Sequence, residues 1–184
     1  MAKGTTIDAP ARFSRWQIRL HWLTLLLIAI AYGAIEAKSF VPKGSTARDL
    51  IMLLHFNAGA LVGALMLVRL GLRLRRPDPA IVPAPPRWQA AAARLGHRVL
   101  YGTFVALPVL GVLVLAYGGK QWSLLGLPVH DLVAPDRATG HTLKEIHETW
   151  AEAGYFIVGL HAAAALFHHY VQRDSALAGM LPRA

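Results

Sequence analysis

The sequence of 184 residues contains no cysteine and has few charged side chains. Without cysteine the chain forms no disulfide, no thiolate-ligated iron–sulfur cluster and no thioether bond to a c-type haem. Any redox group must therefore be held by other ligands. Charged residues make up 16 % of the chain and hydrophobic residues 55 %, and the mean hydropathy is +0.41. This balance differs from that of ordinary soluble domains and indicates a membrane protein.

Four apolar windows are long enough to cross a bilayer as helices, since each crossing needs about 20 residues. They are expected at about 16–37, 50–72, 95–118 and 146–171. Together they take up most of the chain. This predicts a single all-α domain over residues 1–184, an integral membrane four-helix bundle. The first window exceeds the apolar region of a typical signal peptide and lacks a convincing cleavage site after it, so we expect it to be retained.

The basic residues divide unevenly between the two sides of this predicted bundle. With the N-terminus inside, 13 Lys and Arg side chains lie on the inner side and 6 on the outer side. Because inner loops of membrane proteins are enriched in these residues, both termini are predicted to be cytoplasmic. The net charge of +9 then reflects topology and contact with anionic lipid, and we expect no nucleic-acid binding.

Four of the nine histidines stand out because they fall in the predicted spans. Ionisable side chains are costly there and usually face the bundle interior, where they serve function. His147 and His161 are 14 residues apart, which places them within about 40° around the helix axis and about 21 Å apart along it. One helix face thus offers two ligands at two depths.

The partners of these two ligands follow from depth in the bilayer. His21 lies early in an outward-going span and matches His161, whereas His55 opens an inward-going span and matches His147. Two axial imidazoles per iron are a haem arrangement, and facing helices of a bundle supply such ligands. Zinc instead takes about four ligands at one depth. The spacing favours two bis-histidine haems, and a proton or metal-ion pathway remains the alternative.

Gly154 lies midway between the two ligands of the fourth span and on the same face. A residue without a side chain at that point admits either a flat macrocycle or a closely packed helix, and the sequence leaves both open. Glu145, Glu148 and Glu152 project away from the ligand face, so we expect this helix to protrude on the outer side.

Three long segments carry a family resemblance: RWQIRLHWLTLLLIAIAYGAIE, LIMLLHFNAGALVGALMLVRLGLRLRRPDP and HETWAEAGYFIVGLHAAAALFHHYVQRDSALAGMLPR. They resemble the bacterial cytochrome b561 family, in particular its members described as superoxide oxidases. The resemblance covers nearly the whole chain. It implies a multi-pass protein of the bacterial inner (cytoplasmic) membrane with two b-type haems. The family's axial ligands fall on the four histidines that the spacing selects: His21, His55, His147 and His161.

The resemblance also implies an activity that composition and spacing do not provide. It implies an oxidoreductase that oxidises superoxide at the outer face and passes the electrons to ubiquinone, with no protein partner required. The alternative is a cytochrome b subunit that links a partner such as a dehydrogenase or hydrogenase to the quinone pool. A transporter without haem is a third hypothesis.

The remaining histidines are assigned smaller roles. His168 continues the heptad series of His161, and we interpret it as a possible contact to a quinone head group or a haem propionate, or as part of an inward proton path. His97, at the inner start of the third span, is a weaker candidate for such a role at the inner end. His130 and His141 are expected to be surface residues of the outer connection.

Overall fold

The computed structural model describes residues 12–76, 78–129 and 132–182, so His130 and both chain ends lie outside the described residues. The elements in chain order are α1 (Arg15–Ala37), η1 (Lys38–Phe40), α2 (Thr46–Arg75), α3 (Arg87–Tyr117), β1 (Trp122–Leu124), β2 (Leu127–Val129), α4 (Arg137–Phe167), η2 (His168–Gln172) and α5 (Ser175–Ala178). Four helical segments are long and apolar enough to cross a membrane: Arg15–Phe40, Thr46–Arg75, Arg87–Tyr117 and Arg137–Gln172. The predicted all-α membrane bundle is confirmed. That both termini are cytoplasmic stays a prediction.

The helices extend beyond the apolar windows, most of all α3 and α4. The windows begin near residues 95 and 146, whereas α3 begins at Arg87 and α4 at Arg137. Hydropathy detects only the part of a helix that suits lipid, while capping side chains decide where the helix starts. For α4 the cap is Asp136, whose carboxylate accepts from the backbone N–H of Ala138 at 3.0 Å.

The first two helices begin at serine caps. Ser14 and Gln17 form a reciprocal capping box at the start of α1, in which the Gln17 N–H donates to the Ser14 hydroxyl at 3.2 Å. Ser45 accepts from the Arg48 N–H at the start of α2, at 3.3 Å. The Arg48 guanidinium also donates to the carbonyls of Lys38 and Val41, at 2.6 and 3.1 Å, which fixes the turn between α1 and α2.

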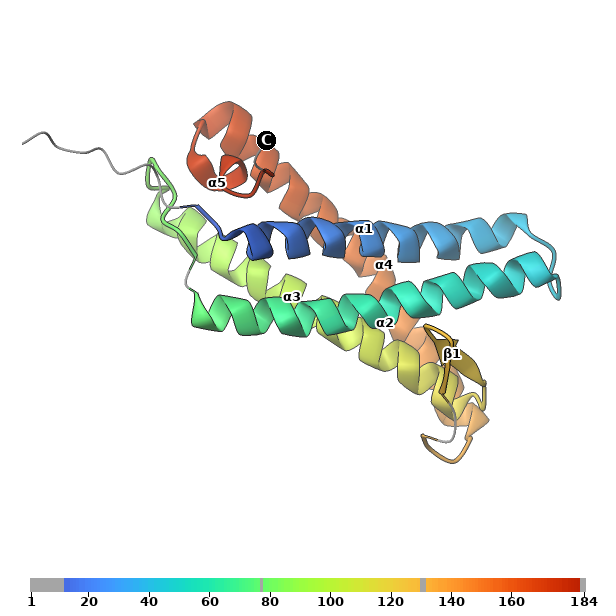
Figure 1. The fold of residues 1–184 in the computed structure, drawn as a ribbon. Helices are drawn as coiled ribbons and strands as arrows, with labels where there is room; N and C mark the ends of the chain where they lie inside the picture. Colours follow the sequence, from blue (N-terminus) through green and yellow to red (C-terminus); the bar gives the residue numbers. More distant parts are fainter. Residues whose placement is uncertain (1–11, 77, 130–131, 183–184) are drawn as a thin grey trace, which may run out of the picture.

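The helices pack in chain order: α1 lies along α2, α2 along α3, and α3 along α4, while α1 and α4 approach each other at few points. Figure 1 shows α1 and α2 side by side, with α3 and α4 crossing them obliquely. The buried cluster comprises Val62, Met66 and Phe104. Gly63 lets α2 approach Pro108 of α3, because a Cβ there would lie 2.9 Å from the proline Cβ.

Large apolar side chains cover the outside of the bundle. Phe156 and Leu160 of α4 are 81 % and 73 % exposed, and Leu26 and Leu67 point outward from α1 and α2. In water such surfaces would drive association, whereas in a bilayer they meet lipid chains of the same polarity. The exposed shell therefore agrees with the membrane assignment.

The two ends of the bundle are closed by different elements, which lie at opposite ends in Figure 1. We call the end where α1 begins the inner end, following the positive-inside prediction. There the segment with η2 and α5 folds back, and the Trp22 indole donates to the Met180 carbonyl at 2.8 Å. At the outer end the hairpin β1–β2 docks on α2: the Asn57 amide donates to the Ser123 carbonyl at 3.0 Å and accepts from the Leu125 N–H at 2.7 Å.

Candidate functional site

The inner histidine pair consists of His21 on α1 and His161 on α4. Their ring centroids are 6.3 Å apart, and the rings are inclined by 57°. Nη2 of Arg69, on α2, lies 3.1 Å from Nδ1 of His21. His97, on α3, lies 5.9 Å from His161 between ring centroids. All four helices thus contribute to this end of the bundle.

The outer pair consists of His55 on α2 and His147 on α4, with centroids 6.4 Å apart and rings at 89°. Nδ1 of His55 lies 2.9 Å from the carbonyl oxygen of Ala31. Since a carbonyl only accepts, Nδ1 carries the proton and Nε2 is left with its lone pair, as a metal ligand requires. Nδ1 of His147 is buried and makes no hydrogen bond among the described residues.

Both separations suit two imidazoles that share one metal ion. A bond from a metal to a histidine nitrogen is about 2 Å long, so two such bonds and the near halves of the two rings span about 6 Å. Within the described ranges, no three His, Cys, Asp or Glu side chains gather around one point. Each of the two pairs would therefore supply two protein ligands to a metal. That donor set fits haem, whose macrocycle provides the other four ligands, better than a structural zinc site.

The space between α1 and α4 is apolar at the level between the two histidine pairs. A groove of about 210 Å³ runs between these helices and is almost entirely apolar. Its walls are Leu25, Ile28, Ala29, Tyr32, Gly154, Tyr155 and Val158. α1 and α4 pack less closely than the other neighbouring helices, so the groove lies outside the α2–α3 core. The donor sets thus fit haem: His21 and His161 would hold one group, and His55 and His147 would hold the other.

Gly154 allows a close contact between helices. A Cβ at this position would collide with the Tyr32 hydroxyl, which lies against the helix and donates to the Ala151 carbonyl at 2.8 Å. Gly154 therefore admits the tip of a side chain from α1 against the α4 backbone. Tyr155 adds a second link from α4 to α1, since its hydroxyl donates to the Glu36 carboxylate at 2.7 Å.

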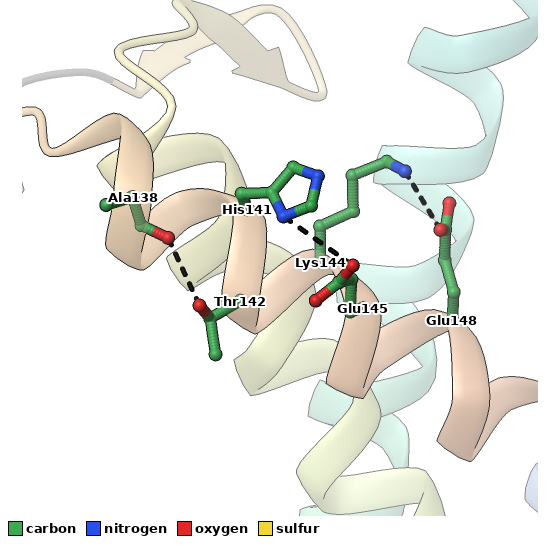
Figure 2. Close-up of polar contacts among 6 residues, drawn as sticks. All are labelled: Ala138, His141, Thr142, Lys144, Glu145 and Glu148. Atoms are coloured by element: carbon green, nitrogen blue, oxygen red, sulfur yellow. Dashed lines mark hydrogen bonds and ion pairs between the residues drawn. The ribbon is translucent and has the colours of Figure 1, made fainter.

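The outer part of α4 carries its charged residues on an exposed face, as the sequence predicted. Figure 2 shows Lys144 donating to Glu148 at 2.9 Å, and His141 next to Glu145 at 3.7 Å. The side chains of the His141–Glu145 pair are 71 % and 66 % exposed. Such pairs contribute little to stability. His141 is thus a surface residue, and it belongs to α4 and not to a loop.

His168 lies away from both pairs, at the start of the π-helical turn η2. Its Nδ1 is 2.5 Å from a carboxylate oxygen of Asp174, whose side chain is only 1 % exposed. The sequence placed His168 at the inner end but did not identify Asp174 as its partner. It also ranked His97 low, although His97 lies closer to His161 than His21 does, and it did not single out Arg69.

Comparisons with known proteins point to one family. A family model described as prokaryotic cytochrome b561 matches residues 12–183. The protein named cytochrome b561 homolog 1 of Escherichia coli is 52 % identical over 172 residues, which cover 94 % of this chain and 98 % of that protein. A probable superoxide oxidase of Yersinia pestis is 38 % identical over 172 residues, which cover 94 % of this chain and 97 % of that protein. The cytochrome b562 of Cereibacter sphaeroides is 29 % identical over 175 residues, covering 92 % and 94 %.

The match therefore extends over the entire described bundle, including both histidine pairs. With the four apolar helices and the two-ligand sites, it shows that the chain belongs to the prokaryotic cytochrome b561 family of membrane electron-transfer proteins that bind haem b.

Proposed function

We propose that this chain is a di-haem cytochrome b of the bacterial inner membrane that oxidises superoxide at the outer face and reduces ubiquinone. The observation that carries the proposal is the presence of two histidine pairs, each about 6 Å across, whose α4 members are 14 residues apart. A rise of 1.5 Å per residue separates those members by about 21 Å. This is a large part of the roughly 30 Å of a bilayer core.

The residues have separate tasks in this proposal. His21 with His161, and His55 with His147, hold one haem b each, and haem b supplies a one-electron carrier when bound. The Ala31 carbonyl fixes the ring orientation and tautomer of His55. Apolar walls, including Val158 and Ile28, keep water from the inter-helix groove.

The substrate assignment is supported by the relative from Yersinia pestis, whose name is probable superoxide oxidase and which is 38 % identical. In the balanced reaction, two superoxide anions each lose one electron and leave as dioxygen. Ubiquinone gains the two electrons, takes up two protons and leaves as ubiquinol. No further oxidant or reductant is required.

The protons for ubiquinone can be supplied at the inner end. His168 and the nearly buried Asp174 share a 2.5 Å hydrogen bond. Such a pair can carry a proton and present it from the imidazole. We propose that His168 contacts the quinone head group and hands it a proton that is replaced through Asp174.

Stopped-flow reduction of the purified protein by superoxide, with and without a short-chain ubiquinone, tests this function. The haem absorption should change to that of the reduced state during the superoxide pulse. With quinone present, it should then return to that of the oxidised state. When superoxide dismutase is added first, it should not change. His168→Ala should slow only the return. No response to superoxide, together with a partner protein that copurifies in equal amount, would refute the proposal and favour an electron-transfer subunit.

A further inference from the structure

Arg69 is a cation inside a membrane-spanning helix. The side chains that its guanidinium contacts are all neutral. Its guanidinium donates to Nδ1 of His21 at 3.1 Å and to Sδ of Met66 at 3.5 Å, and it lies 5.8 Å from the centre of the Tyr101 ring. Within the described residues, no carboxylate lies at ion-pair distance from it. A charge in this environment is costly unless it is paired.

The contact with His21 is incompatible with metal ligation by that ring. Arginine has only N–H donors, so Nδ1 of His21 must be the unprotonated nitrogen in this contact, and the ring proton sits on Nε2. If Nε2 binds a metal as a neutral imidazole, the proton moves to Nδ1, and two donors then face each other. If Nδ1 itself binds the metal, the guanidinium occupies the ligand position. In both cases ligation by His21 displaces Arg69.

The displaced guanidinium needs a new acceptor near the inner pair. A b-type haem brings two propionate carboxylates into the site together with its iron. A carboxylate is the partner that a guanidinium binds most strongly, through two parallel charge-assisted hydrogen bonds. We propose that Arg69 is the counter-ion of a propionate of the inner haem.

Two comparisons within the chain support the assignment to Arg69. Arg73, one turn further along α2, is already paired with Asp78 at 2.6 Å and is therefore not free for a propionate. At the outer end, Nδ1 of His55 donates to the Ala31 carbonyl, so its ring is already in the ligating tautomer. The proposed ion pair thus belongs to the inner site alone, and it rests on the proposed function having a haem there.

Haem b and its dimethyl ester, which lacks both carboxylates, distinguish this role. The probe is the absorbance titration of full-length His55→Ala protein, stripped of haem and reconstituted in detergent, because this variant keeps only the inner ligand pair. With Arg69 present, the ester should bind about 10- to 100-fold more weakly than haem b, as expected for the loss of a charged hydrogen-bonded pair. Arg69→Gln should weaken the binding of haem b by a similar factor. It should not weaken the binding of the ester any further.

Two further variants control for changes in folding. Arg69→Lys keeps the charge and should restore part of the preference for haem b over the ester, whereas Arg73→Gln should leave that preference unchanged. Equal binding of haem b and ester when Arg69 is present would overturn the inference, as would additive losses from the ester and from Arg69→Gln. Failure of haem b to bind at all would instead refute the two-site function.

Discussion

The inner and outer ends of the bundle hold histidine pairs of nearly equal span in different surroundings. At the inner end the pair is contacted by side chains, chiefly Arg69 and His97. At the outer end His55 is oriented by a backbone carbonyl. The spacing of the ligands is thus set by α4, which both pairs share. The neighbouring helices determine which groups lie beside each pair. A cation, Arg69, lies beside the inner pair, and a neutral backbone carbonyl lies beside the outer pair.

This difference suits a protein that moves electrons in one direction. A backbone carbonyl that accepts from Nδ1 makes an imidazole a stronger electron donor to its metal, which favours the oxidised state. A cation close to a redox centre favours the reduced state, because it stabilises the added electron. On the proposed assignment the inner haem would therefore have the higher reduction potential. Electrons that enter at the outer face would then move inward.

Removing one ligand from each pair separates the two ends most completely. His161→Ala should abolish the inner haem and spare the outer one, and His147→Ala should do the reverse, because each iron loses one of its two protein ligands. Reduced-minus-oxidised spectra of the purified variants measure the outcome. His141→Ala, an exposed histidine on the same helix, should keep both haems. Loss of the same spectral component in His161→Ala and His147→Ala would show that the pairing is wrong.

Tyr32 and Gly154 connect α1 and α4 between the two ends. Gly154→Ala places a methyl group on the Tyr32 hydroxyl and should destabilise the fold by about 1–3 kcal/mol. Gly159→Ala is the matched control, since its Cβ meets nothing within 4 Å, and it should be neutral or stabilising by up to about 1 kcal/mol.

Thermal unfolding in detergent gives both of these values. Tyr32→Phe removes the clashing oxygen, so the Gly154→Ala/Tyr32→Phe double variant should lose less stability than the sum of its two single changes. Strict additivity would show that the two side chains do not compete for this space.

Each end has its own closing contact, and these contacts can be released one at a time. Asn57→Ala removes two hydrogen bonds that hold the β1–β2 hairpin, and Trp22→Phe removes one that holds the C-terminal segment. Each bond contributes about 1 kcal/mol. Amide hydrogen exchange should accelerate in residues 122–129 for Asn57→Ala and in residues 175–180 for Trp22→Phe. Acceleration at the opposite end in either variant would mean that the two ends are coupled.

The smallest effect concerns acid at the start of α4. The Thr139 hydroxyl donates to Asp136 and, with the Ala138 N–H, holds the pKa of this carboxyl below its ordinary value of 3.8. A lowered folded-state pKa stabilises the cap above pH 3.8, and the stabilisation is lost as the pH falls through the lowered value. The protection factors of the first-turn amides of α4, which correct for the pH dependence of intrinsic exchange, should therefore fall on acidification. Asp136→Asn should remove this pH dependence, and a variant that keeps it would exclude Asp136 as the source.

The helices and the histidine pairs could be predicted from the sequence because both depend on fixed dimensions. A bilayer sets the length of each apolar span, and the rise of a helix converts the position of His21 or His55 into depth. Depth alone then decides the partners on α4. The first residues of α3 and α4 were missed because polar turns outside the bilayer leave no hydropathy signal.

Lateral neighbours could not be predicted, since they depend on how the helices rotate and cross. The 5.9 Å approach of His97 to His161 and the contact of Arg69 with His21 arise from this packing. His168 shows a different limit. The heptad series assumes a regular helix, but α4 changes to a π-helical turn at this residue, and Arg173 adopts a left-handed conformation at φ 54°. The chain then folds back so that Asp174 contacts His168. No helical period predicts this partner.

The central claim is that one chain holds two separate bis-histidine haems, and the haem-to-chain ratio of the purified protein tests it most directly. Acid–acetone extraction followed by pyridine haemochrome spectroscopy, with the protein measured by amino-acid analysis, gives this ratio without any substitution. We expect two b-type haems per chain, both extractable because the chain has no cysteine to bind them covalently. A ratio near one, or no haem at all, would contradict it.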